Sequence, residues 1–113
     1  MALNPSFASL RKLRSALAAL RAIDPDLTVL QAAALIEIAT AKELTGTQLA
    51  ETLGVPQSTT TRAVDVLGSH GRGGRKGLGL VRRDAAPDDR RVKILKLNAR
   101  GERALAGLAA GID

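Results

Sequence analysis

Cysteine is absent from this chain of 113 residues, and histidine occurs once, at His70. Without thiols the protein has no disulfide framework, no thiolate zinc site and no cysteine-based redox sensor. A single histidine cannot supply the paired imidazoles of a metal site, so we expect neither a metal nor a cofactor. No apolar run approaches the roughly 18 residues that a membrane-spanning helix needs. Basic residues interrupt the apolar ones near the N-terminus, which argues against a signal peptide. They are Arg11, Lys12 and Arg14.

Aromatic side chains are almost as scarce, because Phe7 is the only one and both Trp and Tyr are absent. The core must therefore be built from Leu, Ile, Val and Ala. A small core rich in alanine leaves a thin margin of stability, which association of two chains would increase. We therefore expect a homodimer. The same scarcity argues against recognition of single-stranded nucleic acid, which depends on aromatic stacking.

Acidic residues are fewer than basic ones, and the difference is concentrated in one segment of the chain. The net charge is +6, yet residues 1–67 hold six basic and six acidic side chains, whereas residues 68–93 hold eight basic and three acidic ones. A basic cluster of this kind is typical of a surface that binds a polyanion. A solvated basic surface explains the charge alone equally well.

Residues 5–23 have the pattern of an amphipathic helix with a narrow apolar seam. Seams of this width are used between helices, so we expect this segment to be the dimerisation helix. A basic amphipathic helix can also lie on a membrane surface. Packing on its own domain or on a second subunit fits better, because Phe7 is the only bulky aromatic anchor. The seam comprises Phe7, Leu10, Leu13, Leu17 and Leu20.

A capping box at Thr28 and Gln31 predicts the start of a helix within residues 27–41. The sequence VLQAAALIEIA that follows is apolar around most of its circumference. Such a helix is expected in the interior of the domain.

Residues 45–68 predict a helix-turn-helix. A second capping box, at Thr45 and Gln48, begins a short helix that ends at Gly54. Pro56 restarts the chain in a second helix over 56–68, whose leading face carries short hydrogen-bonding side chains and an arginine. Such side chains suit base edges and phosphates in a major groove. Helix capping also explains Ser and Thr at a helix start, so the pattern alone favours DNA binding only modestly.

Residues 80–97 predict a β-hairpin, because two short β-prone runs flank the polar sequence DAAPDDRR. Asn98 can cap a final helix over 98–112. A helix-turn-helix followed by a hairpin is a winged helix. The expected fold is mainly α with a small β-hairpin wing (α+β), and residues 1–113 form one domain.

The stretch HGRGGRKGLG lies within residues 69–79, between the helix-turn-helix and the hairpin. It fails both phosphate-loop templates. GxxxxGK[ST] needs Ser or Thr where Gly77 stands, and GxGxxG needs a third glycine where Lys76 or Arg82 stands. No nucleophile elbow surrounds His70, and arginines beside Asp88 and Asp89 explain those carboxylates structurally. We therefore expect no enzyme and no catalytic residue.

The chain as a whole resembles a short member of the MarR family of winged helix-turn-helix regulators. Two segments carry the resemblance: LTGTQLAETLGVPQSTTTRAVDVL at 44–67 and GLVRRDAAPDDRRVKILKLNARGERAL at 79–105. The second contains the family's GL-hydrophobic-x-R, D-x-R and L-T-x-x-G patterns in order, with Asn98 in place of Thr. Two further departures are Thr60, where the family has an aliphatic residue, and Pro56, where it has a serine cap. A final helix that ends early would leave helix 5–23 to carry much of the dimer interface.

The resemblance implies a sequence-specific regulator of transcription that binds double-stranded DNA as a homodimer, as a repressor reading a pseudo-palindromic operator. The recognition helix would enter the major groove and the wing the minor groove. Asp89 would orient the wing arginines rather than touch DNA. The implied major-groove residues are Gln57, Ser58, Thr59, Thr61 and Arg62, and the implied wing residues are Arg90 and Arg91. The basic residues near the glycine stretch are assigned to the DNA backbone: Arg72, Arg75, Lys76 and Arg82.

Residues 71–77 look like an insertion relative to the family, either a tolerated linker or a basic loop that contacts the DNA backbone. We favour the second interpretation. A small acidic effector is also implied by the resemblance, and the location implied is cytoplasmic and nucleoid-associated. The alternative function is a winged-helix protein-interaction module or a non-specific nucleic-acid-binding accessory protein, because a fold does not fix a function.

Overall fold

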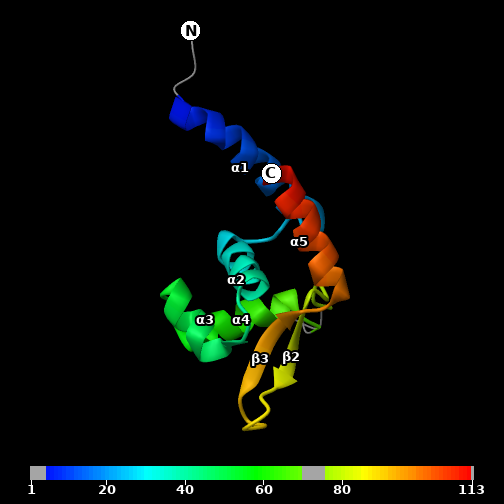
Figure 1. Ribbon diagram of the computed structural model, residues 1–113. Helices are drawn as coiled ribbons and strands as arrows, with labels where there is room; N and C mark the ends of the chain where they lie inside the picture. The colour runs from blue at the N-terminus through cyan, green and yellow to red at the C-terminus, as the bar shows by residue number, and fades with distance from the viewer. Residues whose placement is uncertain (1–4, 70–75, 113) are drawn as a thin grey trace.

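The computed structural model describes residues 5–69 and 76–112. Helices α1 (Pro5–Ile23) and α5 (Ala99–Ile112) lie side by side and project from a lobe that holds all the other elements (Figure 1). The lobe contains α2 (Val29–Thr40), β1 (Leu44–Thr45), α3 (Gly46–Leu53), α4 (Gln57–Leu67), β2 (Val81–Ala85) and β3 (Lys93–Leu97). The described fold is therefore the winged helix that the sequence predicts, and it measures 58 × 28 × 26 Å.

The helix-turn-helix forms as its caps predict. Thr45 accepts from the backbone N–H of Gln48, and the Gln48 side chain accepts from the N–H of Thr45, so both halves of the box are present. Gly54 ends α3 in the left-handed conformation at φ 69°, where a side chain would be strained. These local signals set the turn that orients α4.

Thr60 is the polar exception in the core, with 1% of its surface exposed. Its hydroxyl donates to the carbonyl of Pro56, one turn earlier in the chain, over 3.3 Å. The hydroxyl is thereby satisfied, which allows a threonine to be buried at this position. Pro56 itself precedes α4 without any side-chain cap.

The wing belongs to a three-stranded antiparallel sheet with the order β1-β3-β2. The sequence predicts only the hairpin, in which Arg83 lies opposite Leu95. Strand β1 was missed, because two residues show no periodicity. The strand is stabilised by contacts with distant residues, since Leu44 pairs with Leu95 and is buried in the core.

Helix α2 is less buried than the sequence predicts. Ala34, Leu35 and Ile38 are buried, as expected of an interior helix, but Val29 is 85% exposed and Ile36 is 41% exposed. A single chain of this size has too few elements to cover every face of an apolar helix. The helix is therefore buried on one side only.

The connection from α4 to β2 is closed at its base by backbone hydrogen bonds. Leu78 donates to the carbonyl of Val66 and Leu80 to that of Leu67, both over 2.8 Å. A Cβ at Gly77 would collide with the carbonyl of Gly68, so a side chain there has no room. Asn98 completes the junction, because its amide donates to the Gly79 carbonyl over 2.8 Å and its oxygen caps α5.

Candidate nucleic-acid interface

The predicted major-groove residues lie on the face of α4 that points away from the core. The opposite face is buried through Thr60, Ala63, Val64 and Leu67. Gln57, Ser58, Thr61 and Arg62 are exposed, whereas Thr59 is half-buried. The helical period places Ser58 and Arg62 one above the other on the outward side. The fold therefore brings four of these five residues together on the outward surface of α4, with Thr59 at its edge beside α2.

Gln57 has a structural contact as well as an exposed position. Its amide nitrogen donates to the hydroxyl of Thr47 at the start of α3, over 3.2 Å. The bond joins the first turns of the two helices of the helix-turn-helix. Sequence reasoning did not select Thr47, because only the three-dimensional turn brings it to Gln57.

Arg62 lies beside a shallow hollow between α4 and the start of α2. Thr59 and Arg62 line it from one side and Thr28 and Gln31 from the other, around a volume of about 220 Å³. Within residues 5–69 and 76–112, no carboxylate pairs with Arg62. Its guanidinium is therefore available to an acceptor from outside the chain.

The wing turn holds its arginines around Asp89. The Asp89 carboxylate accepts from the backbone N–H of Arg91 over 3.0 Å and from the Arg91 Nε over 3.3 Å. The Arg91 side chain is nevertheless 92% exposed. Arg90 is exposed beside it. The turn lies at the end of the sheet that points away from α1 and α5 (Figure 1), and both arginine side chains are exposed there.

The residues assigned to the DNA backbone are in three different situations. Arg82 is exposed, but its Nε pairs with Asp84 over 3.0 Å and its Nη1 donates to the Leu97 carbonyl over 3.4 Å. Lys76 is exposed at the closed base of the connection, beyond the C-terminal end of α4. Arg72 and Arg75 lie outside the described residues.

The apolar seam of α1 divides into two parts. Phe7, Leu10, Leu13 and Leu17 are each about half exposed. Leu20 was expected in the same surface, but it is buried against Leu108 of α5 in the chain's own second core cluster. In the single chain Leu20 therefore packs against α5, whereas the rest of the seam is exposed, and its role in a subunit contact stays a prediction.

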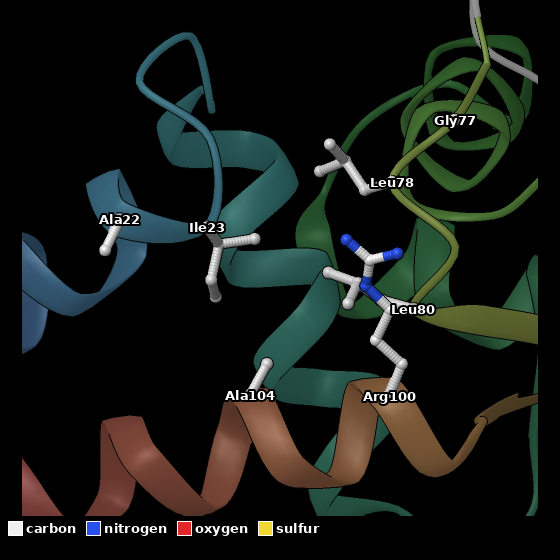
Figure 2. Close-up of a pocket in the computed structure, with 7 residues that line it drawn as sticks. All are labelled: Ala22, Ile23, Gly77, Leu78, Leu80, Arg100 and Ala104. Atoms are coloured by element: carbon white, nitrogen blue, oxygen red, sulfur yellow. The ribbon is translucent and has the colours of Figure 1, made fainter.

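A second hollow lies where α1, α5 and the connection to β2 meet (Figure 2). Its volume is about 310 Å³, and its lining combines the apolar side chains of Ile23, Leu78, Leu80 and Ala104 with at least as much polar surface. The guanidinium of Arg100 rises from α5 between Leu78 and Leu80 (Figure 2). No carboxylate of the described residues pairs with it. Sequence reasoning missed Arg100, because nothing local distinguishes it from a solvated arginine on a helix.

Two classes of site find no support in the part of the chain that the structure describes. It holds no group of three or more acidic, histidine or cysteine residues arranged to bind a metal ion. None of its helices combines the length and the apolar character needed to cross a membrane.

Comparison with known proteins matches residues 26–71 to the MarR family. No curated protein matches the sequence. Among solved structures, the transcriptional regulator Tm0710 from Thermotoga maritima superposes with a TM-score of 0.75 at 24% identity, over 95% of this chain and 68% of that chain. The regulator MarR gives a TM-score of 0.64 at 25% identity, over 92% and 69% of the two chains.

A third solved structure is MepR from S. aureus in complex with DNA. It gives a TM-score of 0.72 at 19% identity, over 96% of this chain and 81% of that chain. At this identity the similarity concerns the fold. The match of residues 26–71 to the MarR family and the fold shared with these solved structures show that the described chain is a winged helix-turn-helix similar to MarR-family regulators.

Proposed function

We propose that this protein is a sequence-specific regulator of transcription that binds double-stranded DNA, with α4 in the major groove and the wing in the adjacent minor groove. One observation carries the proposal: the polar leading face of α4 and the arginines of the wing turn are exposed on the same lobe, and Arg62 lacks a carboxylate partner among the described residues. Short polar side chains and arginine are the groups that read base edges and narrow grooves. A neighbour in fold, MepR, was solved with DNA.

The proposed active species is a homodimer joined through α1. Phe7, Leu10, Leu13 and Leu17 form an exposed apolar stripe along this helix. A second copy of the chain would remove this stripe from water and supply the association that a small core needs. Two recognition helices related by two-fold symmetry would read half-sites about one helical turn apart. Bound across a promoter, such a dimer would exclude other proteins from the same DNA, so repression is the proposed mode of action.

Selection of binding sites from random duplex DNA tests the proposed function. The expected result is a recurring sequence with inverted-repeat symmetry, bound at moderate salt. Enrichment of no sequence, with binding that depends on charge alone, would instead favour the non-specific or protein-binding alternatives.

The hollow at Arg100 supports a small carboxylic acid with an apolar body as an effector. The guanidinium would bind the carboxylate, and the apolar side chains Ile23, Leu78 and Leu80 would contact the rest of the molecule. Benzoate is a suitable probe, with benzyl alcohol as the uncharged control. Benzoate should raise the melting temperature of the wild type and leave that of Arg100→Gln unchanged. Equal shifts for both proteins would place its binding elsewhere.

A further inference from the structure

One ion pair joins the recognition helix to the wing. Arg83 of β2 donates from Nη2 to Oδ1 of Asp65 on α4 over 2.7 Å, with 33% and 37% of the two side chains exposed. The other ion pairs of the described residues are local, since Arg82–Asp84 lies within β2 and Arg91–Asp89 within the wing turn. Sequence reasoning assigned no role to either Asp65 or Arg83.

The start of β2 is already held against the end of α4. The N–H of Leu80 donates to the carbonyl of Leu67 over 2.8 Å, and Gly68 lies so close to β2 that an added Cβ would be 3.3 Å from the Val81 carbonyl. This contact fixes where the strand leaves the helix. It does not by itself fix the direction in which the strand continues.

Arg83 supplies a second fixed point. It lies two residues beyond Val81 on the same face of the strand, roughly 7 Å further along. Two separated contacts between a helix and a strand define the angle between them. We propose that Asp65 and Arg83 are positioning residues that set the direction of the wing relative to the recognition helix, so that both reach DNA together. This inference rests on the proposed function.

The position of Asp65 makes the proposal unusually easy to separate from a simple charge effect. Ser58, Arg62 and Asp65 follow one another at intervals of four and three residues, on the outward side of α4. A carboxylate on that side repels DNA phosphates, so its neutralisation should by charge alone strengthen binding to any duplex. If Asp65 positions the wing, neutralisation should weaken binding to the selected duplex. The two explanations predict opposite signs.

The experiment compares Asp65→Asn with the wild type on a selected duplex and on random duplex DNA. Glu51→Gln is the matched control, because it makes the same change of charge on an exposed residue of α3. We expect Asp65→Asn to weaken binding to the selected duplex about tenfold. Asp65→Asn should leave binding to random DNA unchanged or make it tighter. Glu51→Gln should have this same effect on both duplexes. Unchanged or tighter binding of Asp65→Asn to the selected duplex would overturn the inference.

A double-mutant cycle shows whether the pair acts through the wing. In a background of Arg90→Ala and Arg91→Ala, loss of the Asp65–Arg83 pair should cause no further loss of binding to the selected duplex. Additive losses would overturn the inference. Should Asp65→Asn not fold, as a melting curve would show, Arg83→Gln enters the same cycle in its place.

The exchange variant Asp65→Arg with Arg83→Asp provides the rescue. It re-forms the pair with its charges reversed, so it should recover most of the binding to the selected duplex that either single exchange loses. Absence of any recovery contradicts a positioning role. Failure of the wild type to prefer any duplex is a different result, because it rejects the proposed function itself.

Discussion

At the scale of the residue, the features that matter most are those whose partners lie far away in sequence. Gln57 and Arg62 were selected from the sequence because their types and their place at a helix start suit base edges. Thr47, Arg83 and Arg100 were not selected from the sequence. The contacts that suggest a role for each of them are with residues that only the fold brings close. A polar side chain in a local pattern can be predicted, whereas one that acts across two elements cannot.

Arg62 gives the residue-scale prediction. Arg62→Ala should reduce the preference for a selected duplex over random DNA by about 1–3 kcal/mol, because a base contact carries discrimination. Fluorescence anisotropy titrations on both duplexes measure this preference. Lys42→Ala, which removes the same charge at an exposed position before β1, is the control and should leave the preference intact. An equal loss of affinity on both duplexes for Arg62→Ala would make Arg62 a phosphate contact instead.

At the scale of the element, helix ends were the most predictable feature. Both capping boxes form as their sequences indicate, and α1 spans the same residues that its periodicity predicts. The errors fall where long-range packing decides. Strand β1 forms by pairing with β3, and Val29 has no cover in a single chain. Local propensity cannot supply such information.

The connection between α4 and β2 can be tested through Gly77. Gly77→Ala should lower the free energy of unfolding by about 1–3 kcal/mol, because its Cβ would collide with the Gly68 carbonyl. Gly46→Ala is the matched control, since a Cβ there meets nothing within 4 Å. Urea denaturation should show a lower midpoint for the first variant and none or a slight rise for the second. Equal midpoints for Gly77→Ala and the wild type would mean that the base of the connection is not closed.

The exposed stripe of α1 gives the prediction for the subunit contact. Leu13→Glu combined with Leu17→Glu should yield a monomer or an unfolded chain, because two carboxylates would replace apolar surface that the proposed second copy covers. Sedimentation velocity reports the mass. Ala8→Glu with Ser15→Glu adds the same charge to exposed positions of α1 outside the stripe, and should remain dimeric. A dimeric Leu13/Leu17 variant would move the interface elsewhere.

At the scale of the whole molecule, the sequence predicts the order of elements and the position of the proposed DNA surface. Its charge distribution also indicates the kind of partner, because most of the excess positive charge lies between residues 68 and 93. Two orientations could not be predicted from the sequence. One is the direction in which β2 leaves α4, and the other is the direction in which the paired helices α1 and α5 project from the lobe (Figure 1). The first of these depends on contacts between α4 and β2 such as Asp65–Arg83.

The glycine-rich basic segment at residues 71–77 gives the prediction for the whole molecule. Arg72→Gln, Arg75→Gln and Lys76→Gln together should weaken binding to all duplexes alike. They should also flatten the plot of log affinity against log salt by up to about 0.9 for each lost phosphate contact. Affinity titrations across a series of salt concentrations measure the slope. A slope equal to that of the wild type would leave residues 71–77 as a linker between the recognition helix and the wing.

Chemical footprinting of a selected duplex tests the geometry of recognition most directly. Interference by methylation at guanine N7 reports the major groove, and hydroxyl-radical protection reports the backbone and minor groove. Two recognition helices related by two-fold symmetry predict two blocks of major-groove interference about one helical turn apart, each flanked by minor-groove protection from a wing. A single block, or protection without any major-groove interference, would contradict a dimer that reads DNA through α4.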